Sequence, residues 1–191
     1  MSEDICRYGS KHLGLIGRRQ ALSSALCAAG VFASFPRDAL AAAREMAPLA
    51  EDEAFMREAL AEAAKGDFPF GAIIIRDGEV VARGRNLGKT NNDPTAHGEM
   101  VAIRDFIARR PAAEMVGTAL YTTGEPCPMC MSAILWCGIS RVVFAASIEK
   151  LAQRIGQILL TSRTVADAAP FAEITITGGV LSAEALALFG K

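Results

Sequence analysis

Residues 118–136 read TALYTTGEPCPMCMSAILW. The first six residues are mostly β-branched or aromatic, which is typical of a strand, and the last nine, Pro128 to Trp136, have the pattern of a helix. Between the two lies CPMC, residues 127–130. A Cys-x-x-Cys pair indicates a redox couple, part of a structural zinc site or part of a catalytic zinc site. The choice depends on which other metal-binding side chains the chain contains.

Histidine is scarce in this sequence, which narrows the search for further ligands. The chain contains two histidines, His12 and His97, and we place His12 in an N-terminal leader described below. With Cys127 and Cys130, His97 makes three protein ligands and leaves the fourth position of a tetrahedral zinc site for water, as in catalytic sites. Glu99 follows two residues later, where a carboxylate can exchange protons with that water without binding the metal.

The two other interpretations of the cysteines explain less. A structural zinc site needs a fourth protein ligand, and Cys137 is the obvious candidate. It follows Cys130 by two helical turns, about 10 Å along a helix axis, which is too far to share one metal ion. We therefore expect Cys137 to be a small buried hydrophobic residue. A redox role for the pair leaves His97 and Glu99 without a purpose.

Helical and strand patterns alternate along the rest of the chain. Apolar spacing predicts helices at 51–65, 97–110, 128–136, 148–160 and 182–189. Strands are predicted at 118–123, 141–147 and 171–179, and FGAIIIRDGEVVARGRN predicts a hairpin that turns at Asp77-Gly78. This alternation predicts a layered α/β fold, with helices on both faces of a mixed sheet.

His-x-Glu followed by Pro-Cys-x-x-Cys resembles the signature of zinc-dependent nucleobase deaminases, and the chain is similar to the cytidine deaminase superfamily. PFGAIII (69–75), NNDPTAHGEMVAI (91–103) and LYTTGEPCPMCMSAILW (120–136) most resemble bacterial guanine deaminases and tRNA adenosine deaminases. The resemblance covers about residues 51–147 and implies a three-layer α/β/α cytidine-deaminase-like fold with a mixed central sheet.

The resemblance also implies roles for individual residues. His97, Cys127 and Cys130 are expected to bind Zn²⁺, and Glu99 is expected to be the general acid and base. The substrate contacts that we expect are Asn86, the backbone of Ala96, the pocket walls Phe70 and Trp136, and Glu125.

Two features depart from the guanine deaminase pattern. Gly98 replaces the alanine usual between His and Glu in that group, and His-Gly-Glu also occurs in fungal-type cytosine deaminases. Residues 148–191 do not follow the acidic, aromatic tail with which guanine deaminases close the pocket. The resemblance therefore leaves the base open, with guanine as the leading candidate.

The function that we predict is hydrolytic deamination of a free nucleobase or nucleoside, with release of ammonia. The alternatives are a tRNA-specific adenosine deaminase and a non-catalytic zinc-binding protein with the same fold. Five of the 20 basic and three of the 21 acidic residues lie in residues 1–41, which leaves 15 basic and 18 acidic residues in the remainder. Non-specific binding of nucleic acid usually requires a basic excess, so we do not expect a nucleic-acid partner. The resemblance also implies a homo-oligomer, such as a dimer.

The N-terminal region has the pattern of an export signal. Within GLIGRRQALSSALCAAGVFASFPRDALAAA (14–43), Arg18-Arg19 precede an apolar run and the small-residue pattern Ala39-Leu40-Ala41. The apolar run is about fifteen residues long, shorter than a membrane span. This order predicts a twin-arginine signal peptide over residues 1–41 and a periplasmic or exported deaminase domain over 42–191, with no membrane anchor after cleavage. The alternative is a cytoplasmic N-terminal extension with a chance arginine pair.

Overall fold

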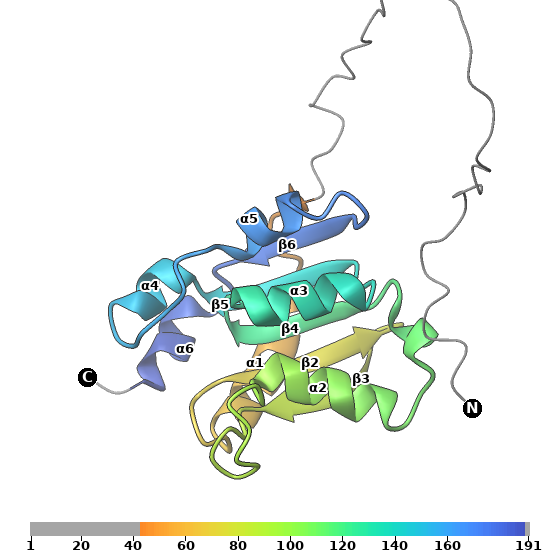
Figure 1. The fold of residues 1–191 in the computed structure, drawn as a ribbon. Helices are drawn as coiled ribbons and strands as arrows, with labels where there is room; N and C mark the ends of the chain where they lie inside the picture. The colour runs from red at the N-terminus through yellow and green to blue at the C-terminus, as the bar shows by residue number, and fades with distance from the viewer. Residues whose placement is uncertain (1–42, 190–191) are drawn as a thin grey trace, which may run out of the picture. The chain divides into compact units, whose positions relative to one another are not determined.

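A six-stranded mixed sheet forms the middle layer of the fold, in the order β1-β6-β5-β4-β2-β3 (Figure 1). The strands are β1 (Ala43–Glu45), β2 (Gly71–Arg76), β3 (Glu79–Arg85), β4 (Ala119–Gly124), β5 (Arg141–Ala146) and β6 (Ile174–Gly178). The first four strands in that order are mutually parallel, whereas β2 is antiparallel to both β4 and β3. The structure is a computed structural model that describes residues 43–189, so the predicted signal peptide, residues 1–41, lies outside the described residues.

Helices cover both faces of this sheet. They are α1 (Asp52–Ala63), α2 (Gly98–Ile107), the 3₁₀ helix η2 (Ala112–Met115), α3 (Pro128–Trp136), α4 (Ile148–Ala152), α5 (Ser162–Asp167) and α6 (Ser182–Ala187). Buried residues of α2, α3 and α5 form one apolar cluster with the sheet, and those of α1, α4 and α6 belong to a second cluster. The predicted three-layer α/β/α arrangement is therefore confirmed.

Strand β2 shows how one short sequence supplies both layers. Ala72 and Ile74 belong to the cluster under α2 and α3, while Ile73 and Ile75 belong to the cluster under α1. Successive strand residues point to opposite faces, so a continuous apolar run is required wherever helices cover both faces.

Most predicted elements are present with boundaries shifted by a few residues. The predicted turn at Asp77-Gly78 joins β2 to β3, and both of its residues have positive φ, as a type I′ hairpin turn requires. The strand β1 was not predicted, because three residues are too short to show a pattern. It pairs in parallel with β6 at the sheet edge.

The predicted helix over 148–160 is wrong in its second half. Helix α4 ends at Ala152, residues 153–160 follow without regular helix, and α5 begins at Ser162. Gly156 disfavours a helix interior by about 1 kcal/mol. Ile155 and Ile158 instead line a cavity, so tertiary contact outweighs the helical spacing. Within the described part of the chain, no helix combines the length and the apolar character needed to cross a membrane.

Candidate metal centre and active site

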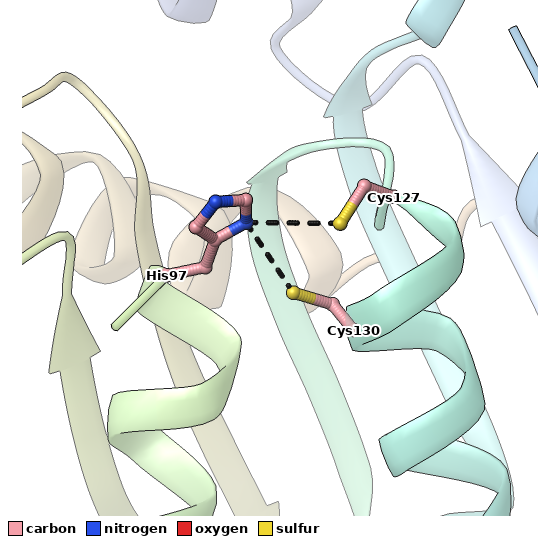
Figure 2. A group of neighbouring side chains, drawn as sticks. All are labelled: His97, Cys127 and Cys130. Carbon is pink, nitrogen blue, oxygen red and sulfur yellow. Dashed lines mark hydrogen bonds between the residues drawn. The ribbon is translucent and has the colours of Figure 1, made fainter. Parts of the chain in front are cut away.

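The cysteines and the histidine meet where two helices begin beside the carboxyl end of β4. His97 is the N-cap of α2 and Cys127 is the N-cap of α3, and both have extended backbone conformations. Pro128 follows as the first residue of α3, a position that suits proline because its nitrogen needs no helical partner. Cys130 lies in the first turn of α3, so its thiol faces the same side as that of Cys127 (Figure 2).

The three donor atoms have the spacing of a tetrahedral metal site. Nδ1 of His97 lies 3.7 Å from Sγ of Cys127 and 3.6 Å from Sγ of Cys130 (Figure 2). The three ligand atoms lie within 4.8 Å of one another. Zinc bonds of about 2.0 Å to nitrogen and about 2.3 Å to sulfur place the two donors roughly 3.6 Å apart at a tetrahedral angle. The residues therefore fit a zinc ion, and Cys137, at the far end of α3, is outside the group.

The electrostatics of this group of side chains concentrate negative charge on Cys127. The hydrogen bond from the Cys130 thiol, aided by His97, lowers the pKa of Cys127 to about 4. The hydrogen bond with Cys127 in turn raises the pKa of Cys130, because a second thiolate beside the first is unfavourable. The hydrogen bond with Cys127 raises the pKa of His97. A metal cation is the partner that allows both sulfurs to be thiolates.

Glu99 stands next to this group and is almost completely buried. It lies in the first turn of α2, two residues after His97, and its side chain is 4% exposed. Burial in surroundings of low polarity raises the pKa of Glu99. A carboxyl group with a raised pKa can both accept and return a proton near neutral pH.

The start of α2, which carries His97 and Glu99, packs closely against the backbone of β3. A side chain on Gly84 of β3 would meet the carbonyl of Gly98 at 2.2 Å, so α2 begins directly against the sheet. A Cβ on Gly98 itself would lie 3.1 Å from the carbonyl oxygen of Phe70. Glycine at position 98 thus avoids a tight contact with the backbone of Phe70.

The loop before His97 is fixed by its own polar side chains. Oδ1 of Asp93 accepts hydrogen bonds from the backbone nitrogen and the hydroxyl of Thr95, at 2.8 and 2.6 Å. Arg104 of α2 donates to the other oxygen of Asp93 at 3.2 Å. These contacts connect the loop to the helix and hold His97 at the helix start.

A cavity of about 670 Å³ opens onto the metal-binding residues. Its lining includes Phe70, Asn86, His97, Glu99, Glu125, Cys127 and the segment Ile155–Ile158. This volume is within the usual range for small-molecule sites. The cavity also includes Phe68 and Lys89, whose Nζ lies 4.7 Å from the centre of the Phe68 ring. We did not predict Phe68, Lys89 or the Ile155–Ile158 wall from the sequence. The helical pattern of 148–160 does not indicate that this segment lines a cavity.

Two of the expected substrate contacts, Asn86 and Phe70, line this cavity. Phe70 lines the cavity and packs edge to face on Phe189, with ring centres 5.1 Å apart. Oδ1 of Asn86 accepts a hydrogen bond from the backbone nitrogen of Gly88 at 3.1 Å. Its Nδ2 donates no hydrogen bond within the described part of the chain, so this amide can donate to a bound molecule.

Of the other three expected contacts, Ala96 and Trp136 do not line the cavity, whereas Glu125 does. Ala96 is fully buried beside His97, and its carbonyl accepts from Leu87 while its N–H donates to Asp93. Trp136 does not reach this cavity: it ends α3, is 75% exposed and stacks on Phe171 with ring centres 4.6 Å apart. Trp136 lies outside the cavity because it is eight residues beyond the start of α3, whereas the metal ligands lie at the first turn of that helix. Glu125 lines the cavity but is already bonded within the protein.

Residues 49–146 match the family described as the cytidine and deoxycytidylate deaminase zinc-binding region. The chain belongs to this deaminase family. The guanine deaminase of Bacillus subtilis is 42% identical over 99 residues, 49% of this chain and 64% of that protein. The tRNA-specific adenosine deaminase of the same organism is 38% identical over 102 residues, 51% of this chain and 63% of that protein. Each match thus spans less than two thirds of the relative's length.

Solved deaminase structures share the fold as well. A guanine deaminase from Nitrosomonas europaea is similar with a TM-score of 0.62 at 26% identity, covering 76% of this chain and 85% of that chain. The group of His97, Cys127 and Cys130 lies in this structure within the residues that match a zinc-binding family region, which is consistent with the metal that its geometry suits.

Proposed function

We propose that this chain is a zinc-dependent hydrolytic deaminase of a free nucleobase or nucleoside. The observation that carries the proposal is the buried carboxylate of Glu99, which lines the same cavity as His97 and Cys127. A purely structural metal site needs no acid at this place, and a binding protein gains nothing from burying one beside thiolates. The relatives named guanine deaminase and tRNA-specific adenosine deaminase support this class of reaction.

The metal site provides the electrophilic half of the chemistry. A zinc ion held by His97, Cys127 and Cys130 would supply a Lewis acid that makes a water molecule nucleophilic near neutral pH. The two helix N-termini that carry the ligands direct partial positive charge toward this point and stabilise negative charge there.

Glu99 performs the proton transfers. Its carboxylate takes a proton from the attacking water and delivers it to the ring nitrogen next to the carbon that carries the amino group. It then transfers the second proton of that water to the departing amine, which leaves as ammonia. The substrate loses NH₃ and gains the oxygen of water, so the ring carbon ends as a carbonyl, and Glu99 returns to its starting state.

Asn86 and Phe70 hold the base in place. The free Nδ2 of Asn86 donates to an acceptor on the edge of the ring, and the Phe70 ring supplies an apolar surface. Removing Asn86 leaves a ring acceptor without its partner, which costs about 1–3 kcal/mol when that acceptor is buried.

A small molecule suits this cavity better than a nucleic acid does. The cavity is of small-molecule size, and the sequence after residue 41 carries more acidic than basic residues, which does not favour the phosphate backbone of tRNA. One of the two lining carboxylates, Glu125, has both oxygens occupied, so Glu99 is the acid available to a substrate.

The test is ammonia release by the zinc-loaded full chain. The panel contains guanine, adenine, cytosine and isocytosine, their nucleosides, and a tRNA anticodon hairpin. Turnover of one or more free bases or nucleosides supports the proposal and identifies the substrate. Turnover of the hairpin alone replaces it with the tRNA alternative, and no release from any of them supports the non-catalytic zinc protein.

We also propose export by the twin-arginine route, supported by the order of Arg18-Arg19, apolar run and Ala39-Leu40-Ala41 in the sequence. N-terminal sequencing of the protein from a periplasmic fraction should start just after Ala41. A product in that fraction that still begins at Met1 contradicts it.

The assembly that we propose is a homo-oligomer. The stacked rings of Trp136 and Phe171 are 75% and 59% exposed, and exposed apolar groups of this size are typical of contact surfaces. Light scattering on the purified chain should give a mass of two or more chains, whereas the mass of one chain contradicts the assignment.

A further inference from the structure

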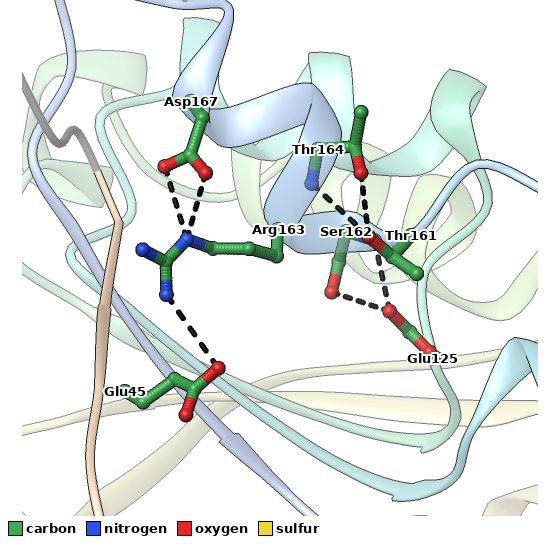
Figure 3. Close-up of polar contacts among 7 residues, drawn as sticks. All are labelled: Glu45, Glu125, Thr161, Ser162, Arg163, Thr164 and Asp167. Atoms are coloured by element: carbon green, nitrogen blue, oxygen red, sulfur yellow. Dashed lines mark hydrogen bonds and ion pairs between the residues drawn. The ribbon is translucent and has the colours of Figure 1, made fainter.

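Glu125 lines the cavity two residues before Cys127, and both of its oxygens are engaged. Oε2 accepts a hydrogen bond from the backbone nitrogen of Ile148 at 2.9 Å. Oε1 accepts from the backbone nitrogen and the hydroxyl of Ser162, at 2.9 and 2.8 Å (Figure 3). The residue is 8% exposed. A carboxylate bonded in this way is a structural group of the protein, so the expected role of Glu125 as a substrate contact is not supported.

The groups that donate to Glu125 are the starts of two helices. Ile148 is the first residue of α4 and Ser162 is the first residue of α5. The first N–H groups of a helix have no partner within the helix and carry partial positive charge, so a carboxylate there is favourable. One side chain thereby joins two points of the chain that are 37 and 23 positions away from it.

The segment between these two points forms one wall of the substrate cavity. Ile155 to Ile158 line the same cavity as His97, Glu99 and Cys127. Within residues 156–160 of the described structure, one backbone–backbone hydrogen bond forms, from Leu160 to Ile158. The side chains of Ile158 and Leu159 are 60% and 73% exposed. A segment with so few backbone hydrogen bonds of its own depends on its ends for its position.

We propose that Glu125 is a positioning residue that anchors both ends of the segment 148–162 and so sets the distance of the Ile155–Ile158 wall from the bound substrate. Pro126 alone separates Glu125 from Cys127, so the short stretch between β4 and α3 carries both a metal ligand and the anchor of the substrate wall. This inference rests on the proposed function for its effect on substrate, but the anchoring itself is testable without turnover.

The first variant is Glu125→Gln. The amide keeps one acceptor oxygen and turns an NH₂ group toward the N–H of Ile148 or of Ser162, where two donors cannot bond. We expect KM to rise about tenfold while kcat stays within about twofold, because a displaced wall weakens binding of substrate and transition state alike. Zinc content should stay unchanged. Peptides covering 153–160 should exchange amide hydrogens about tenfold faster than in the unaltered chain.

A second variant keeps the test valid should Glu125→Gln fail to fold. Ser162→Pro removes both hydrogen bonds to Oε1, and proline suits the first position of α5 because the preceding Thr161 is extended. It leaves Glu125 and the bond to Ile148 in place. We expect the same rise in KM and the same faster amide exchange of 153–160. The matched control is Glu149→Gln, the same chemical change at an exposed residue of α4, which should leave KM and exchange unaltered.

Three results would overturn the inference. The first is an unchanged KM together with unchanged exchange of 153–160 in both variants. The second is a fall in kcat at constant KM, which would place Glu125 in the chemistry. The third is loss of zinc, which would make it a support of the metal ligands. An unaltered chain that releases no ammonia contradicts the proposed function instead, and the exchange measurement still decides whether Glu125 anchors the wall.

Discussion

Nδ1 of His97 lies 3.6 Å from Sγ of Cys130, although 33 positions separate the two residues in the chain. The two helices that carry them, α2 and α3, lie over the same face of the sheet, and each begins at the edge where β4 ends (Figure 1). Ligands in α/β folds characteristically bind at the carboxyl ends of strands, where helix N-termini gather. The metal site follows from that topology.

The first prediction concerns metal content. The unaltered chain should hold one zinc ion, and Cys130→Ala should lose it, because the two remaining ligands cannot complete the site. Removal of zinc from the unaltered chain by a chelator should lower the melting temperature by about 5 °C or more, since a ligand bound only by the folded state stabilises it. Metal analysis and thermal unfolding measure both effects.

Cys137→Ala is the control for this experiment. Cys137 follows the last residue of α3 and packs against the core, away from the ligand group. Its alanine variant should retain zinc. Equal loss of zinc from the variants at 130 and 137 contradicts the assigned ligand set.

The second prediction concerns Asn86. Asn86→Asp keeps the oxygen that accepts from Gly88 and replaces the free donor with an acceptor. The loop should therefore stay in place while kcat/KM falls by about 100-fold, through loss of one substrate hydrogen bond and a new repulsion. Steady-state kinetics on the substrate found in the panel measure this. Kinetics equal to those of the unaltered chain would show that Asn86 does not touch the substrate.

The grouping of His97, Cys127 and Cys130 beside Glu99 was predictable because its signal is local. His97 with Glu99, and Cys127 with Cys130, are close pairs whose spacing places each pair in one helical turn, and the structure adds the meeting of the two pairs. The layered fold was predictable for a similar reason, since strands such as β2 and helices such as α3 have clear periodicity.

The cavity wall was not predictable, because its signal is non-local. The apolar spacing of 148–160 favours a helix, and only the bonds from Ile148 and Ser162 to Glu125 show why the segment takes another course. Trp136 illustrates the opposite error. Its place in a family motif suggested a pocket wall, but the direction of α3 sets it on the surface against Phe171.

The third prediction concerns stability at the other end of the sheet. Asp52 is fully buried and accepts hydrogen bonds from the two terminal nitrogens of Arg141, at 2.8 and 2.7 Å, and from the hydroxyl of Tyr121 at 2.8 Å. Asp52→Asn removes the charge and leaves Arg141, itself mostly buried, without its partner. The free energy of unfolding should fall by about 3 kcal/mol. Glu53→Gln, at an exposed neighbour, should change it by less than about 0.5 kcal/mol.

The same pair predicts a dependence of stability on pH. Burial alone would raise the pKa of Asp52, but the bonds from Arg141, Leu49 and Tyr121 outweigh it and lower the pKa below its ordinary value of 3.8. A carboxylate with a lowered folded-state pKa stabilises the fold above its ordinary pKa, and this stabilisation is lost as the pH falls through the folded-state pKa. Denaturant unfolding between pH 2 and 5 should show a smaller loss of stability with acid in Asp52→Asn. Parallel curves for the two proteins contradict this prediction.

The central claim is that Glu99 transfers protons at a zinc site, and one comparison tests it most directly. Zinc content and ammonia release are measured side by side for the unaltered chain and for Glu99→Gln, on the base or nucleoside that the panel identifies. Glutamine keeps the size of the side chain but cannot carry a proton between water and substrate. The account predicts equal zinc in both proteins and a kcat at least about 100-fold lower in the variant. A Glu99→Gln variant that holds zinc and releases ammonia at the unaltered rate would contradict it.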